Sequence, residues 1–68
     1  MKYLIIEIQK SNEGPVAITP VEILETRDAA EHRFHTILAS AAISQVNVHS
    51  VVMLDDNGDT VRKESYYH

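Results

Sequence analysis

One segment of this 68-residue chain has helical periodicity, and this single helix limits the folds that the chain can form. In residues 26–44, TRDAAEHRFHTILASAAIS, apolar side chains recur at helical spacing and form one stripe. The stripe consists of Ala30, Phe34, Ile37, Leu38 and Ala41. Because one helix can cover only one face of a sheet, the rest of the chain must form that sheet and leave its other face to a different partner.

The other segments have the composition and alternation of β-strands. They are residues 2–10, 16–25, 46–56 and 60–68. A turn is predicted at 11–15, SNEGP, and Asn57-Gly58 is a strong signal for a two-residue hairpin of type I′. Pro20 cannot donate a hydrogen bond to a neighbouring strand, so it places its strand at an edge of the sheet or in a bulge.

This order of segments predicts an α+β fold of the ββαββ type over a single domain, 1–68. We expect a four-stranded antiparallel sheet with the helix packed on one face. The apolar first and third strands should be central, which gives the strand order 2-1-3-4. At the start of the helix, Thr26 or Asp28 is the expected N-cap, and Asp28 and Glu31 have the spacing of a capping box.

Composition limits both stability and function. A core in so short a chain rarely supplies more than about 3–5 kcal/mol, and the absence of cysteine excludes disulfides and thiolate zinc sites. The net charge of −4 argues against general nucleic-acid binding. No apolar run approaches the ~18–20 residues of a membrane span and no signal-peptide pattern precedes the first strand, so we expect a cytoplasmic protein without a membrane partner.

The strands are apolar on both of their faces. If Leu4, Ile6 and Ile8 contact the helix, other apolar side chains of the central strands must point away from it. These are Tyr3, Ile5, Val51 and Met53. We predict that they form a patch that a second copy of the chain buries. The small residues of ASAAIS (39–44) either reflect helix propensity or let Ala39 and Ile43 provide a second contact surface.

Two groups of polar residues are candidates for a site. His32 and His35 lie with Asp28 on one flank of the helix, where weak solvated ion pairs are favoured over a metal site. In the last strand, RKESYYH, Arg62 and Tyr66 share a face and suit a phosphate or nucleotide, although an amphipathic terminal strand has the same pattern. The candidate ligand-binding residues are Arg62, Tyr66, His49, His35 and Arg33.

No motif for catalysis is visible. The sequence has no nucleophile elbow, phosphate-binding loop or HEXXH spacing, and its Asp-rich stretch DDNGD is favoured as a hairpin turn over a calcium loop. We therefore expect no enzyme activity, no catalytic residues, no metal and no cofactor.

Four stretches together resemble a group of short proteins that are common in gut bacteria and their prophages. They are YLIIEIQ, TRDAAEHRFHTILASAAIS, VNVHSVVMLDDNG and YYH, and they cover most of the chain. The resemblance implies a small prophage or phage accessory protein, of a class that often acts by binding. It assigns no role to His35 or His49.

We therefore expect a non-catalytic, homo-oligomeric binding protein. Its target would be a host protein or a nucleotide-like small molecule held at a subunit interface. The alternative is a structural, self-assembling module whose partner is itself or another phage protein. A third hypothesis, a metal-dependent enzyme that uses His32, His35 and His49, lacks the spacing of a known motif.

Overall fold

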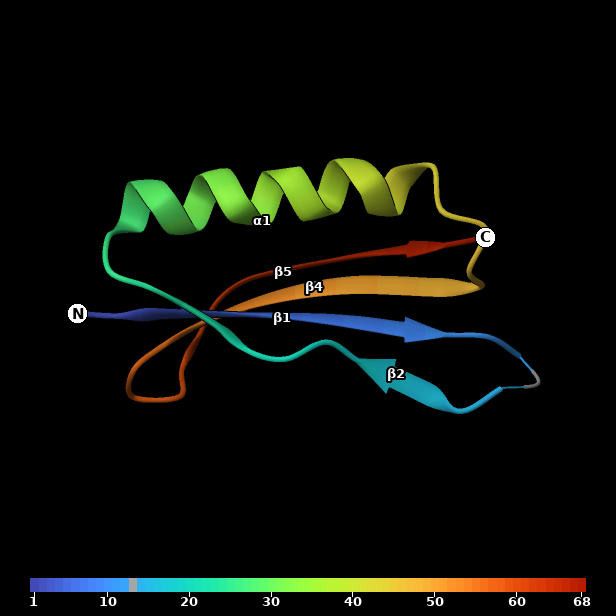
Figure 1. Cartoon of the computed structure of the whole chain (residues 1–68), viewed down its shortest axis with the longest axis horizontal. Coiled ribbons are helices and arrows are strands. Elements are labelled where there is room, and N and C mark those ends of the chain that lie inside the picture. The colour runs from blue at the N-terminus through green and yellow to red at the C-terminus, as the bar shows by residue number, and fades with distance from the viewer. Residues whose placement is uncertain (13) are drawn as a thin grey trace.

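A computed structural model describes residues 1–12 and 14–68. Over these residues it has two layers, one helix lying across one face of a five-stranded antiparallel sheet (Figure 1). The elements are β1 (Tyr3–Lys10), β2 (Val16–Ile18), β3 (Glu22–Leu24), α1 (Arg27–Ala42), β4 (Val48–Asp55) and β5 (Thr60–Tyr67). The predicted α+β class is confirmed. Within the turn predicted at 11–15, residue 13 lies outside the described residues.

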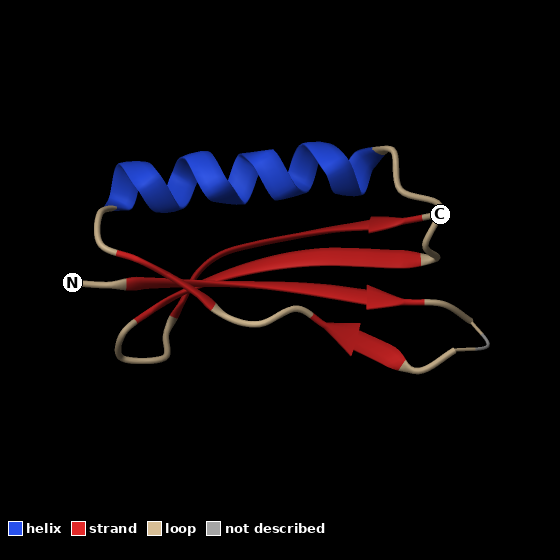
Figure 2. Ribbon diagram, viewed as in Figure 1, coloured by secondary structure: helices blue, strands red, loops and turns tan. Residues whose placement is uncertain are grey.

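The predicted count of four strands is wrong, because the segment 16–25 divides into β2 and β3 around Pro20 (Figure 2). Both pieces pair with the same edge of β1, with Ile18 opposite Ile8 and Glu22 opposite Ile5. The segment between the pieces therefore has one residue more than the stretch of β1 that it faces, which defines a β-bulge. Pro20 has no N–H to donate, so the pairing breaks at this point.

The strand order agrees with the prediction. The sheet runs β2-β1-β4-β5, and β3 also pairs with β1. Strand β4 pairs with β1 from Val48 opposite Lys10 to Asp55 opposite Tyr3. The apolar strands β1 and β4 are therefore central, while β5 and the β2–β3 pair form the two edges.

Helix α1 begins at an N-cap formed by Thr26, whose hydroxyl accepts a hydrogen bond from the Ala29 N–H at 3.2 Å. The predicted capping box of Asp28 and Glu31 does not form. The N-cap is Thr26, and the carboxylate of Glu31 accepts a hydrogen bond from Arg27. The predicted apolar stripe is confirmed. Ala30, Phe34, Ile37 and Ala41 are buried, and Leu38 is partly buried against the same core.

The helix covers the face of the sheet opposite to the predicted one. The core beneath α1 contains Ile5, Val51 and Met53 together with Ala30, Phe34 and Ile37. The predicted exposed patch of Tyr3, Ile5, Val51 and Met53 is therefore wrong: three of its members are buried under the helix and Tyr3 packs against them. The side chains that point away from the helix are those of the alternate positions. We call this surface the open face; its apolar and aromatic residues are Leu4, Ile6, Ile8, Val16, Ile18, Ile23, Val48, Val52, Leu54 and Tyr67.

Polar side chains explain this orientation. Apolar alternation alone does not choose a face, because β1 and β4 are apolar on both. Glu7 and His49 lie on the helix side of the sheet and hydrogen-bond to each other there. Glu22 lies on the same side and pairs with Arg33 of α1. Turning the sheet over would separate Arg33 from Glu22 and leave apolar side chains in the place of these polar partners.

The hairpin between β4 and β5 lies where Asn57-Gly58 predicts it, but the predicted type I′ turn is wrong. A type I′ turn needs positive φ at both central residues, and among the described residues only Gly58 has it, at 89°. Asp55 holds the loop instead. Its carbonyl accepts from Gly58 N–H at 3.1 Å, and its carboxylate accepts from the N–H groups of Asn57 and Asp59 at 2.9 and 3.0 Å.

In the described part of the chain, no helix has both the length and the apolar character needed to cross a membrane.

Candidate functional site

The most buried polar contact joins Glu7 of β1 to His49 of β4. His49 is 4% exposed, and its Nε2 hydrogen-bonds to the Glu7 carboxylate. The other ring nitrogen, Nδ1, is buried and has no hydrogen-bond partner among the described residues. A carboxylate accepts hydrogen bonds only, so Nε2 carries the proton in this contact. The pair places a polar group inside an otherwise apolar core.

A cavity of about 240 Å³ opens beside this pair, between α1 and the bulged edge of the sheet. Its apolar wall includes Ile5 and Ile37, and its polar wall includes Glu7 and Glu22. The bulge forms the outer wall, where Thr19 is fixed by hydrogen bonds to the backbone of β1. The break in pairing at Pro20 therefore creates the cavity, because a regular strand would continue close to β1 here.

Arg33 lies at this cavity and pairs with Glu22. The pKa of Arg33 is raised above its ordinary value chiefly by the hydrogen bond to Glu22. Partial desolvation opposes this shift, and the negative charges of Glu22 and Glu7 reinforce it. The cavity wall is thus a place of negative potential, with Arg33 as its counter-charge.

A second charged cluster lies on the other flank of α1, around Glu31. Its carboxylate contacts Arg27 at 3.2 Å, Arg62 of β5 at 3.1 Å and His35 at 3.5 Å. Burial alone would raise the pKa of Glu31, but hydrogen bonds from Arg27 and Arg62 outweigh it, and the pKa lies below its ordinary value. The guanidinium of Arg62 also lies 5.8 Å from the centre of the Phe34 ring. This cluster fastens β5 to the helix.

Tyr66 and His68 lie together at the C-terminal end of the helix. Their rings stack with centroids 6.2 Å apart, and Nε2 of His68 donates to the carbonyl of Ala41 at 3.0 Å. A histidine near the last turn of a helix is placed favourably for the helix dipole. The two aromatic side chains therefore contribute to holding the end of β5 against α1.

The candidate ligand-binding residues do not converge on one site. Arg62 and His35 contact Glu31 on the β5 flank of the helix, whereas Arg33 pairs with Glu22 on the β3 flank. His49 is buried beneath the helix. Tyr66, which is directly opposite it on the edge strand β5, is 38% exposed. The predicted sharing of one face by Arg62 and Tyr66 is confirmed, since both pair with helix-side residues of β4. A nucleotide could not contact all five residues within one copy of the chain.

The histidines of the helix lie apart from His49. His32 and His35 are exposed on α1, and His49 is buried beneath it. Over residues 1–12 and 14–68, no cluster of three or more His, Cys, Asp and Glu side chains is placed to hold a metal. Ala39 and Ile43, the other predicted contact residues, are exposed, and Ile43 is 85% exposed. Their role in an interface stays a prediction.

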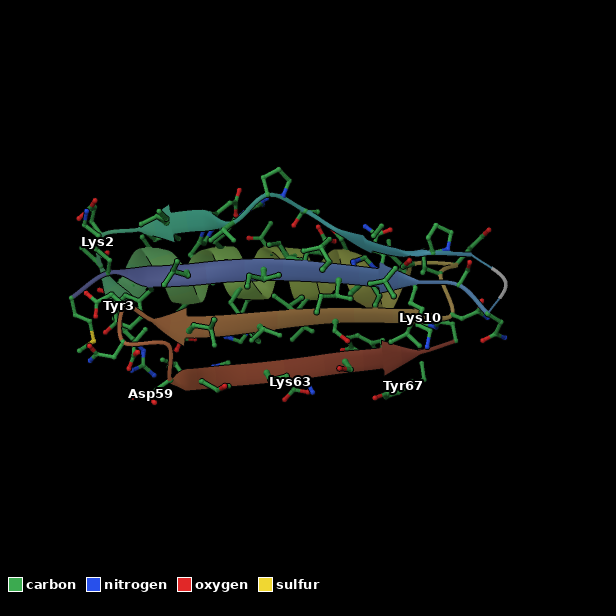
Figure 3. The ribbon with its side chains drawn as sticks, turned by 90° about the horizontal axis from the view of Figure 1, so that it is seen from below. Lys2, Tyr3, Lys10, Asp59, Lys63 and Tyr67 are labelled. Atoms are coloured by element: carbon green, nitrogen blue, oxygen red, sulfur yellow. The ribbon has the colours of Figure 1, made fainter. Side chains whose placement is uncertain are left out.

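Charges are segregated between the two sides of the sheet. In the described strands, the carboxylates of Glu7, Glu22, Asp55 and Glu64 all lie on the helix side. The two strand lysines, Lys10 and Lys63, lie on the open face opposite Val48 and Val52. Figure 3 shows Lys10 at one end of this face and Lys63 along the β5 edge. The open face is therefore apolar in its centre and positive at its margin.

Sequence patterns did not single out Glu7 or Glu22 as site residues. The available signal was a charged residue within each of two otherwise apolar strand segments, YLIIEIQK and VEIL. A carboxylate on the covered side of a strand needs a partner from another element. Searching for that partner among the basic and histidine residues would have suggested His49 and Arg33.

Comparison with models of protein families, with curated proteins and with solved structures finds no match to this chain.

Proposed function

We propose that the protein is a non-catalytic binding protein that acts as a homo-oligomer, in which a second copy covers the open face. One observation carries this proposal. The sheet has apolar residues on both faces, and the helix covers only one of them. Ile18 and Ile23 on the open face remain 62% and 57% exposed. Contiguous exposed apolar surface of this kind usually marks an interaction site.

The size of the open face agrees with a small dimer interface. Seen as in Figure 3, the Cα positions extend over 38 by 16 Å. These extents include the loops, so each copy offers at most on the order of 600 Å², and two copies would bury up to about 1,200 Å², the lower end of standard interfaces. The core under the helix is also small for independent stability. Burying the open face would add apolar contacts that the single chain lacks.

The helix-side charges pair with one another across elements of the fold. Arg33 is engaged by Glu22, Arg62 by Glu31, and His49 by Glu7. These side chains hold elements of the fold together. The resemblance to prophage proteins is consistent with an accessory protein that binds a host protein or a small molecule. A self-assembling structural module is the second candidate, and the apolar centre of the open face would serve it equally well.

The test of assembly uses two neighbouring residues on opposite faces. Light scattering at micromolar concentration should give the wild type a mass of at least twice the 7.7 kDa of one chain. Ile6→Glu places a charge on the open face and should give monomers. Ile5→Glu places the same charge in the core, where Ile5 is 1% exposed, and should unfold the chain.

A second variant keeps this test clear if Ile6→Glu folds poorly. Ile6 lies directly opposite Val52, so the double change Ile6→Glu and Val52→Lys creates a cross-strand ion pair within one monomer. It should be folded by circular dichroism and monomeric by light scattering. A wild type that is folded and monomeric would overturn the proposal, as would an assembly that survives both open-face variants.

A further inference from the structure

The cavity beside the Glu7–His49 pair has a chemistry of its own. It lies on the helix side of the sheet, away from the open face, and the bulge at Pro20 forms its outer wall. We propose that this cavity binds a small organic cation, with its ammonium group held by Glu7 and Glu22 and its short apolar part against Ile5 and Ile37. The inference deepens the binding function proposed above by naming a ligand class and a site.

The charge of the lining favours a cation. The lining contains the carboxylates of Glu7 and Glu22 against the single guanidinium of Arg33. The hydrogen bonds described for these carboxylates use Oε2 of each: His49 and Gln9 contact that of Glu7, and Arg33 donates to that of Glu22. Oε1 of each is left to accept from a ligand. An ammonium group has donors and no acceptor, so it matches this pair of acceptors.

Size and sign argue against a nucleotide at this position. The volume of about 240 Å³ lies below the ~300–1,000 Å³ typical of sites for drug-sized ligands. A phosphate would also face two carboxylates, and its attraction to Arg33 would have to disrupt the existing pair with Glu22. A cation can instead bind with that pair left in place.

The apolar wall sets the second requirement for the ligand. Ile5 and Ile37 belong to the core and are 1% and 6% exposed, so they are fixed by packing and contribute a small, rigid apolar part of the cavity lining. An alkyl chain of a few carbons would cover this surface, and a bare metal ion would not. A short alkylammonium therefore fits the combination of apolar lining and acidic wall better than an inorganic cation or a neutral alcohol.

The experiment is an NMR titration of the full ¹⁵N-labelled chain with n-butylammonium chloride at constant ionic strength. Saturable shifts should appear for the amides of Glu7, Val21, Glu22 and Arg33. Butyrate, which reverses the charge, should produce none, and 1-butanol, which removes it, should bind about tenfold or more weakly, as expected for loss of a charge-assisted hydrogen bond.

Three variants locate the site. Glu22→Gln removes one acceptor charge at the surface and should weaken binding about tenfold. Val21→Phe enlarges a lining residue while leaving every charge in place and should weaken binding, and Val21 is exposed enough to accept the larger side chain. Glu64→Gln is the matched control, because its carboxylate lies on the same side of the sheet but outside the cavity.

Equal shifts with butyrate, or unchanged binding in both Glu22→Gln and Val21→Phe, would overturn the inference. So would shifts that fail to saturate in the wild type. The two proposals fail separately: a wild type that assembles without binding n-butylammonium overturns only this one, and a monomer that binds it overturns only the proposed assembly.

Discussion

The carboxylate of Glu7 hydrogen-bonds to Nε2 of His49 beneath the helix, although 42 residues separate the two in the chain. The contact joins the central strands on the side that α1 covers. Without Glu7, His49 would have two ring nitrogens buried with no partner from the described residues, since Nδ1 already has none. The pair therefore lets the helix cover a face of the sheet that contains polar side chains.

This relationship predicts coupling between the two residues. Glu7→Leu should cost about 1–3 kcal/mol, because it leaves a buried imidazole without its acceptor. The double change Glu7→Leu and His49→Leu should recover part of that loss, with an interaction energy of about 1 kcal/mol or more. Urea unfolding at one fixed protein concentration measures all members of the cycle. Strictly additive losses would show that the hydrogen bond does not contribute.

Gly58 provides a test of the β4–β5 loop. Its φ of 89° is strained for a residue with a side chain, although a Cβ would meet no atom within 4 Å. Gly58→Ala should therefore lower the free energy of unfolding by about 1–2 kcal/mol through the backbone alone. Gly58→Asn should cost less, because Asn tolerates positive φ better. An equal loss in the two variants, measured by thermal unfolding, would contradict this explanation.

The cluster around Glu31 predicts a dependence of stability on pH. The folded pKa of Glu31 lies below its ordinary value of 4.5, because Arg27 and Arg62 favour the ionised form against the effect of desolvation. A depressed carboxylate pKa stabilises the fold above the unfolded pKa, and the contribution is lost as the pH falls through the folded pKa. Glu31→Gln should thus be less stable than the wild type at neutral pH.

The difference between Glu31→Gln and the wild type should shrink as the pH falls below 4.5 and should vanish below the folded pKa. Melting temperatures recorded between neutral and strongly acid pH measure it. Glu64→Gln is the control, as Glu64 is an exposed acid of β5, away from the ends of the helix. A constant difference at every pH would show that the side chain of Glu31 acts through packing instead of charge.

Local chemistry made parts of the fold predictable. Pro20 identifies the edge strand and the bulge, because a residue without an N–H cannot donate to a neighbouring strand in any arrangement of the sheet. The stripe from Ala30 to Ala41 identifies the buried side of α1 because helical spacing fixes which side chains lie together. The hairpin position follows from Asn57-Gly58. Its turn type does not, since the hydrogen bonds of the Asp55 carboxylate favour a different loop.

Local sequence patterns do not predict which face of the sheet the helix covers. Alternation separates Ile5 from Ile6 but does not say which of them meets the helix, since both positions belong to apolar rows. That choice depends on contacts between distant elements, such as Arg33 with Glu22 and Glu7 with His49. The dispersal of the candidate ligand residues has the same origin. Arg33 of α1 pairs with Glu22 of β3, whereas Arg62 of β5, at the opposite edge of the sheet, pairs with Glu31 of α1.

The lysines of the open face predict how the proposed assembly responds to salt. Lys10 and Lys63 are the charged residues that the described strands place on this face, so a second copy brings further positive charge and no carboxylate from its own strands. Salt screens such repulsion: the Debye length falls from about 10 Å at 0.1 M to about 3 Å at 1 M. Sodium chloride should therefore strengthen self-association.

Lys63→Met separates this effect from a general influence of salt on apolar contacts. It replaces a charge at the β5 margin with an apolar side chain of similar length, so it should tighten the assembly at low salt and reduce its salt dependence. Arg27→Met, on the helix side, should leave the salt dependence unchanged. Sedimentation equilibrium across this range of salt measures both. Dissociation of the wild type by salt would mean that ion pairs join the copies, and the open face could not then be the contact.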